Sequence, residues 1–204
     1  MSNKLTEEQK NVVDYSGCNL VVNAFAGSGK TTTGIEYLRK RGSEKKLYLC
    51  FNKSVQIEVQ SKIKTLGIRN IDVLTAHSLA YRRLKISSEI SPTIRAFDLV
   101  NFLGWKKTKR NFIKAKLAID IFNYYCTSGL ERIEEVNYLK DINPFIPIDS
   151  EVYEIITRES SIYDSALKIF NLMADGKFPM THDFYLKLFQ LSKPKLNYDI
   201  IFFD

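Results

Sequence analysis

The sequence predicts an α/β fold in which a parallel sheet is interrupted by a long helical insertion. In the first half, short apolar runs alternate with helical patterns, which is typical of βαβ units. Between about residues 85 and 179 the apolar residues instead recur at three- and four-residue spacing, which indicates helices. An apolar run returns in the last residues, DIIFFD, and we expect the sheet to resume there.

The elements of the first half follow from apolar periodicity and from the residues that punctuate it. We expect a short helix over residues 5–14, a buried strand over 20–24, a helix over 30–40, a strand over 46–51, a helix over 53–64 and a strand over 71–74. The connections between them are short, as α/β units require.

Three apolar faces define the helical block: Phe97, Val100 and Leu103; Leu117, Ile121 and Tyr125; and Ile162, Ala166, Ile169 and Met173. Pro144, Pro147 and Pro179 punctuate it, because proline cannot continue a helix. A further helix is expected over 181–191. We therefore divide the chain into a sheet domain of residues 1–84 and 180–204, which is expected to be incomplete, and an inserted helical subdomain of residues 85–179.

Composition narrows the classes of protein. The chain has 204 residues, 45% of them hydrophobic, and a net charge of +7, which favours a globular protein with an anionic partner. Six basic residues and no acidic one lie between Gly104 and Leu117. A solvated helix face is a simpler interpretation of this cluster than a patch that binds nucleic acid. The three cysteines lack CxxC spacing, so we expect core positions rather than disulfides or zinc. Without a membrane span or signal peptide, we expect a cytoplasmic protein, or a nuclear or nucleoid-associated one.

The strongest motif follows the first expected strand. The residues after Leu20 read VVNAFAGSGKTT, a strand, a loop of small residues and a helix start, as in a Walker A phosphate-binding loop. Backbone amides of such a loop approach phosphates closely, and Lys30 and Thr31 supply a charge for the β and γ phosphates and a hydroxyl for Mg²⁺. The expected nucleotide-binding residues are Ala24, Ala26, Gly27, Ser28, Gly29, Lys30, Thr31 and Thr32.

The loop resembles the AxAGxGKT form found in superfamily 1 DNA helicases of the UvrD/Rep type, in which Ala24 takes the place of the usual first glycine. Upstream, LTEEQ ending at Gln9 resembles the Q motif of that family, whose glutamine reads the adenine. An alternative interpretation of this segment is a capped helix start, in which Thr6 and Gln9 form a capping box.

Two further segments resemble family motifs that contact single-stranded DNA. Phe51, Asn52 and Lys53 follow one expected strand, and Thr75 and His77 follow the next. Because parallel strands end at the same edge of a sheet, both segments are expected at a ligand-binding edge. Phe51 stands where the family has threonine, and Ala76 where it has an aromatic residue. A capped helix start also explains Thr75 without DNA.

The C-terminal segment resembles the approach to Walker B in F-box DNA helicase relatives. This resemblance makes Asp204 a Mg²⁺ partner and, with Lys30, a catalytic residue. It implies a RecA-like ATP-binding domain, ATP and Mg²⁺ as cofactors, single-stranded DNA as substrate, 3′–5′ translocation, and a C-terminal RecA-like domain of the same protein as partner. The 204 residues alone are then expected not to hydrolyse ATP. The alternatives are a P-loop binding module or another P-loop ATPase without unwinding activity.

Overall fold

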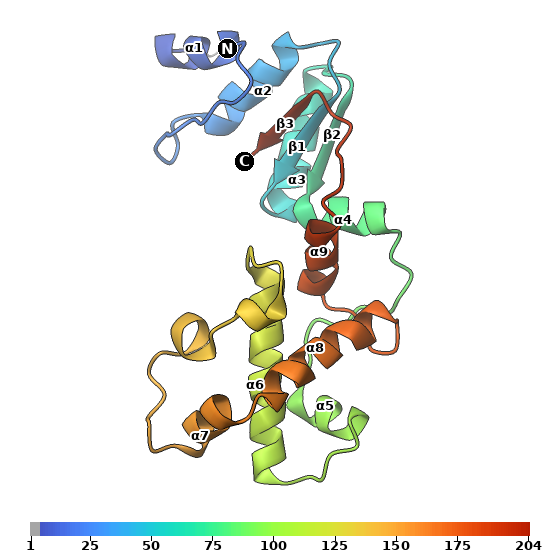
Figure 1. Ribbon diagram of the computed structural model, residues 1–204. Helices are drawn as coiled ribbons and strands as arrows, with labels where there is room; N and C mark the ends of the chain where they lie inside the picture. The colour runs from blue at the N-terminus through green and yellow to red at the C-terminus, as the bar shows by residue number, and fades with distance from the viewer. Residues whose placement is uncertain (1–4) are drawn as a thin grey trace. The chain divides into compact units, whose positions relative to one another are not determined.

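The computed structural model describes residues 5–204 and divides into two compact units. The first holds the chain up to Leu79 together with Lys195–Asp204, and the second holds Ala80–Pro194. Figure 1 shows the sheet within the first unit and the helical bundle that forms the second. The mixed α/β fold expected from the sequence is confirmed.

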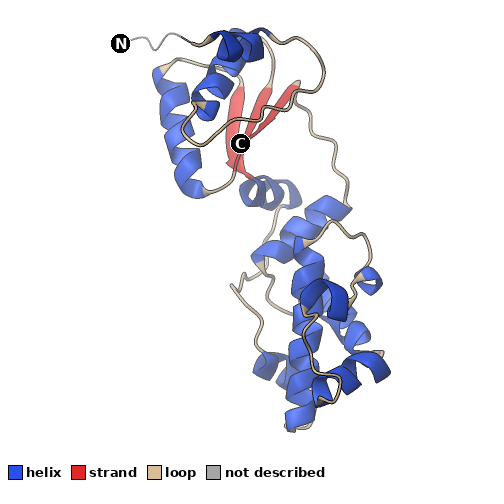
Figure 2. Ribbon diagram, turned by 90° about the vertical axis from the view of Figure 1, so that its left-hand side faces the viewer, coloured by secondary structure: helices blue, strands red, loops and turns tan. Residues whose placement is uncertain are grey.

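The first unit contains a parallel sheet whose strand order is β2-β1-β3 (Figures 1 and 2). Tyr48 in the central strand lies opposite Val73 on one side and Phe202 on the other. The elements of this unit are α1 (Glu7–Asp14), α2 (Lys30–Lys40), β1 (Lys46–Cys50), α3 (Lys53–Thr65), β2 (Ile71–Thr75) and β3 (Ile200–Phe203). All six agree closely with the predicted ranges.

The core of the first unit lies on one face of this sheet. Side chains two residues apart in a strand share a face, so Tyr48 and Cys50 of β1 point the same way as Val73 of β2. They form one buried cluster with apolar residues of α2 and α3, namely Ile35, Leu38, Val59 and Ile63. This packing attaches the middle and the C-terminal part of α2 to the sheet.

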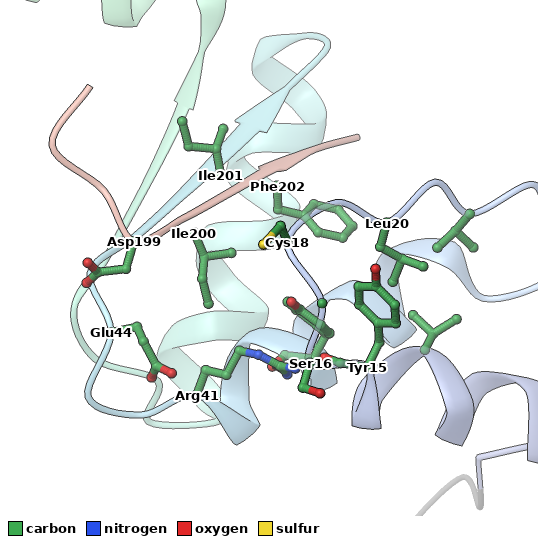
Figure 3. Close-up of a pocket in the computed structure, with 14 residues that line it drawn as sticks. Tyr15, Ser16, Cys18, Leu20, Arg41, Glu44, Asp199, Ile200, Ile201 and Phe202 are labelled. Carbon is green, nitrogen blue, oxygen red and sulfur yellow. Dashed lines mark hydrogen bonds between the residues drawn. The ribbon is translucent and has the colours of Figure 1, made fainter. Parts of the chain in front are cut away.

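The prediction of a strand over residues 20–24 is wrong. These residues form no strand, and Val21 is 83% exposed. A cavity of about 350 Å³ separates Leu20 and Val22 from β3, and Figure 3 shows Leu20 beside Phe202 at its wall. The apolar side chains of this segment are typical of a buried strand. A strand also requires a neighbouring strand within hydrogen-bonding distance of its backbone. Here β3 pairs with β1, and the segment lies across the cavity from it.

The second unit is built around α6, which packs against α5, α8 and α9. Along the chain, the boundary between the two units falls within α4, between Leu79 and Ala80. The predicted faces on α6 and α8 are buried throughout, but Phe97 is 51% exposed and stacks on Phe112 instead. The elements are α4 (Ala76–Leu84), α5 (Ala96–Phe102), α6 (Lys109–Thr127), a 3₁₀ helix (Ile133–Glu135), a π-helix (Tyr138–Ile142), α7 (Glu151–Arg158), α8 (Ser161–Ala174) and α9 (His182–Leu191).

Within residues 5–204 two lysines are wholly buried, which composition alone does not predict. Lys46 donates to the main-chain oxygens of Arg41 and Glu44 at 2.6 and 2.8 Å. Lys187 on α9 donates to the main-chain oxygens of Ser128 and Leu130, just beyond the end of α6. Burial lowers the pKa of both ammonium groups. Each carbonyl group offsets part of the cost of desolvating the charge.

Two of the three cysteines lie in the core. Cys50 and Cys126 are buried, as expected, whereas Cys18 is exposed because the segment that carries it lies outside the sheet. No helix in residues 5–204 is both long enough and apolar enough to cross a membrane.

Candidate nucleotide-binding site

The loop before α2 has the backbone conformation that its glycines predict. Gly27 and Gly29 have φ angles of 76° and 87°, in the left-handed region that L side chains rarely adopt. Gly29 is the N-cap of α2 and no side chain caps it. The first amides of α2 are therefore oriented toward the loop, where the helix dipole favours an anion.

Lys30 folds back over this loop. Its Nζ donates to the main-chain oxygens of Ala24 and Phe25, at 3.0 Å each. The side chain is exposed, so its charge is accessible to an anion held by the loop amides. A phosphate group at this position would compete for the ammonium group with two neutral carbonyl groups, and charged hydrogen bonds are the stronger ones.

The carboxylate of Asp204 meets the start of α2. Thr31 donates from Oγ1 to Asp204 Oδ2 at 3.2 Å, although the two residues lie 173 positions apart in the chain. Tyr48 donates from its hydroxyl to the same oxygen at 2.6 Å. Burial, the hydrogen bond to Asp204 and the charge of that carboxylate raise the pKa of Tyr48, so its hydroxyl remains a donor. Burial and then the Asp204 charge raise the pKa of Cys50 to about 11.

Gln9 joins the helix cap to the phosphate loop. Its Oε1 accepts from the Thr6 amide at 3.0 Å and its own amide donates to Thr6 Oγ1 at 3.3 Å, so the capping box is formed. Its Nε2 also donates to the main-chain oxygen of Ser28 at 3.1 Å. The structure therefore confirms the capped helix start and also brings Gln9 to the loop. Adenine recognition by Gln9 stays a prediction.

The two segments predicted to contact DNA follow β1 and β2, where Cys50 and Thr75 are register partners. Asn52 caps α3 by accepting from Val55 N, and Lys53 donates to Gln56. Thr75 accepts from the Ser78 amide at 3.1 Å, as the capped-start alternative requires.

Phe51 presents an exposed aromatic side chain at this edge. Its side chain is 87% exposed, directly after a buried strand. His77, by contrast, is half-buried. An exposed aromatic ring at the end of a parallel strand offers a face on which a base can stack.

The basic cluster of the helical unit is largely neutralised by nearby carboxylates. Arg110 forms ion pairs with Glu159 at 2.6 Å and with Glu151 and Glu154 at 3.7 and 3.6 Å. Lys114 pairs with Glu159 as well. The cluster joins α6 to the ends of α7, which supports its interpretation as a surface helix face.

Comparison with known families agrees with this geometry. The profile of the UvrD/REP helicase N-terminal domain matches residues 5–170. The chain belongs to this family. F-box DNA helicase 1 of Gallus gallus is 30% identical over 214 residues, an alignment that covers 98% of this chain and 21% of that protein. F-box DNA helicase protein 1 of Schizosaccharomyces pombe is 34% identical over 89 residues, which cover 42% of this chain and 10% of that protein.

The chain thus spans about a fifth of the length of the Gallus gallus relative. No solved structure matches the chain significantly.

Tyr48 was not among the residues predicted for the site, and the structure places its hydroxyl against Asp204. A tyrosine hydroxyl in the middle of a buried strand requires a hydrogen-bond partner, so the sequence could have predicted that Tyr48 has a polar partner. The partner itself lies 156 positions away and could not be foreseen. No group of three or more His, Cys, Asp or Glu side chains within residues 5–204 is arranged to hold a metal ion.

Proposed function

We propose that this chain binds Mg²⁺-ATP at the loop before α2, as the nucleotide-binding part of an ATP-dependent DNA helicase. The observation that carries the proposal is the contact between Thr31 and Asp204, which joins the two nucleotide motifs at the first turn of α2 beside Lys30. The loop amides would hold the phosphates, and Lys30 would exchange its carbonyl partners for phosphate oxygens.

The residues present fit a magnesium ion. Mg²⁺ prefers oxygen ligands and is usually held by one or two carboxylates together with substrate phosphates and water. Thr31 supplies a hydroxyl and Asp204 a carboxylate within 3.2 Å of each other. The bound ion would neutralise charge on the phosphates, while Lys30 and Asp204 are the catalytic residues that this chain contributes.

Removal of the Lys30 charge tests the nucleotide site. Lys30→Ala deletes a charged hydrogen bond worth about 1.5 to 3 kcal/mol, so the affinity for ATP should fall roughly 10- to 150-fold. Lys40→Ala is the matched control, because Lys40 ends the same helix and forms an ion pair with the exposed Asp14. Titration of a fluorescent ATP analogue measures both. Equal affinity in folded Lys30→Ala protein and in the control would reject the site.

We also propose that single-stranded DNA lies along the sheet edge after β1 and β2. Phe51 would stack on a base, while Lys53, Asn52, Thr75 and His77 would contact the backbone or bases next to it. If about three phosphates are neutralised, the logarithm of affinity should fall with the logarithm of salt concentration with a slope of about −2. The 3′–5′ direction rests on resemblance alone.

Fluorescence anisotropy with labelled single strands at several salt concentrations tests this edge. Phe51→Ala should weaken binding by about 1 to 3 kcal/mol, as expected for one stacked base. Arg110→Gln is the control, because Arg110 is already paired with three glutamates in the helical unit. A slope near zero, or a loss with Arg110→Gln that matches the loss with Phe51→Ala, would contradict the assignment.

The competing function is a P-loop module that binds nucleotide without unwinding DNA. A strand-displacement assay with 3′ and 5′ overhangs, performed on the longest natural form of the protein, separates the two. It also tests the proposed second RecA-like domain, because unwinding requires an arginine that reaches the γ-phosphate from outside this loop. If the protein is a DNA helicase, its place of action is the compartment that holds the DNA, the nucleus in a eukaryote.

A further inference from the structure

Tyr48 lies in β1, the central strand of the sheet, and its hydroxyl contacts Asp204 of the candidate site. It is wholly buried in the central strand, and its ring lies 4.8 Å from that of Phe202, its register partner in β3. The hydroxyl extends beyond the ring to Asp204 Oδ2 at 2.6 Å. The ring is thus held by its neighbours, and its hydroxyl has a fixed position at the end of β3.

The same aromatic pair fixes the distance between α2 and β3. A Cβ atom added at Gly34 would lie 2.3 Å from Cζ of Phe202, so the helix backbone approaches this ring as closely as a residue without a side chain permits. Gly34 lies one turn beyond Thr31, and Asp204 follows shortly after Phe202. The contact therefore sets the helix at the height where Thr31 reaches Asp204.

Both hydrogen bonds that the described residues make to this carboxylate fall on one oxygen, Oδ2. The carboxylate plane is then fixed by two donors from different elements, Thr31 on α2 and Tyr48 on β1. The other carboxylate oxygen would then be available to help hold a Mg²⁺ ion. Hydrogen bonds of this kind orient metal ligands and account for a substantial part of metal affinity.

We propose that Tyr48 is a positioning residue, whose hydroxyl orients the Asp204 carboxylate for the Mg²⁺ ion that accompanies the nucleotide. The inference rests on the proposed nucleotide site and extends it to a residue outside the recognised motifs. In this role Tyr48 would contact neither the nucleotide nor the metal ion. It acts through Asp204, and its removal should change the metal dependence of binding more than binding itself.

The test is Tyr48→Phe, which removes the hydroxyl and retains the ring that packs against Phe202. Affinity for a fluorescent ATP analogue is measured in EDTA and as a function of Mg²⁺ concentration. The affinity in EDTA should match that of the wild type, whereas the Mg²⁺ concentration for half-maximal enhancement should rise about 10- to 100-fold. Electron paramagnetic resonance of Mn²⁺ bound with the analogue should show the same loss of affinity.

Tyr198→Phe is the matched control. It removes a similar bond, from Tyr198 to Asp72 Oδ2 at 2.7 Å, near the start of β2 and β3 and far along the strands from Asp204. A second comparison places Tyr48→Phe in an Asp204→Asn background. If Tyr48 acts through the carboxylate, the additional substitution should then have no further effect on metal dependence.

The outcomes separate the inference from the proposed function. Absence of Mg²⁺-enhanced binding in the wild type, or unchanged affinity in Lys30→Ala, would reject the nucleotide site itself. A wild type that binds as proposed, together with Tyr48→Phe that behaves like Tyr198→Phe, would overturn the inference alone. The inference would also be overturned if adding Tyr48→Phe to Asp204→Asn raised the Mg²⁺ concentration for half-maximal enhancement as much as it does in the wild type. Thermal unfolding of each variant, with the affinity in EDTA, shows whether the fold is intact.

Discussion

Substitution of Gly34 by alanine tests the packing that joins α2 to the sheet. In most helix interiors this change is favourable by about 1 kcal/mol, because alanine has the higher helix propensity. Here the added methyl group would lie 2.3, 2.8 and 3.0 Å from three carbons of the Phe202 ring. These distances are far inside van der Waals contact, so either the ring or the helix must move.

The magnitude follows from what surrounds the ring. Overpacking typically costs about 1 to 3 kcal/mol. The Phe202 ring cannot move toward β1, because the Tyr48 ring lies 4.8 Å from it on that side. The added methyl group would overlap three carbons of the ring at once, so we place the strain in the upper part of that range, at about 2 to 3 kcal/mol. Subtraction of the gain in helix propensity leaves a net destabilisation of about 1 to 2 kcal/mol.

Amide hydrogen exchange in β1 and β3 measures this loss locally. A change of 1 to 2 kcal/mol accelerates exchange through local or global opening by roughly 5- to 30-fold. Gly42→Ala is the control, because an added Cβ there meets no atom within 4 Å and the backbone is not left-handed. That variant should be unchanged or more stable by up to about 1 kcal/mol.

If Gly34→Ala exchanged as slowly as Gly42→Ala, the close packing against Phe202 would not be what positions α2. A second consequence concerns the site. Displacement of α2 from β3 lengthens the separation of Thr31 and Asp204, so Gly34→Ala should also weaken the Mg²⁺ dependence of nucleotide binding.

Two predictions concern buried groups. Lys187→Met retains most of the side-chain volume but leaves buried carbonyl groups without a donor. Urea unfolding should therefore show a loss of stability of about 1 to 3 kcal/mol for each such group. Lys193→Met is the control, because the Lys193 side chain is 70% exposed, and it should change stability by less than about 0.5 kcal/mol. Equal effects would contradict the role of the buried ammonium group. A thiol reagent at pH 8 should modify Cys18 rapidly in the native protein and Cys50 and Cys126 only after denaturation, because burial raises the pKa of those two thiols to about 11 and about 12. Rapid modification of more than one thiol in the native protein would show that the core opens readily.

Short-range patterns in the sequence determined the elements and the loop. Helix α2 begins and ends at the predicted residues, since Gly29 before it and the charged residues at its end are local signals. The same holds for the left-handed glycines of the loop, whose conformation depends on a few adjacent residues. The capping box at Thr6 and Gln9 is likewise confined to one helical turn.

The tertiary structure alone decided which distant groups meet. Residues 20–24 have the composition of a buried strand, but strand formation depends on a partner edge that the sequence does not specify, and here the segment is exposed. The basic cluster on α6 has a local charge that suggests a polyanion, yet carboxylates at the two ends of α7 neutralise much of it. Local composition determines which structure or partner a segment favours. The residues that the fold places beside the segment decide whether that structure or contact forms.

The site shows the same division. Lys30 and Thr31 could be named from the loop, and Asp204 from the resemblance of its strand. The hydrogen bond that joins Thr31 to Asp204 spans 173 positions, and the one from Tyr48 spans 156. Such contacts depend on strand order, register and the height of α2 above the sheet. The sequence by itself therefore determined which groups are candidates for binding a nucleotide, and only the packing of α2 on β3 brought Thr31 and Asp204 within hydrogen-bonding distance.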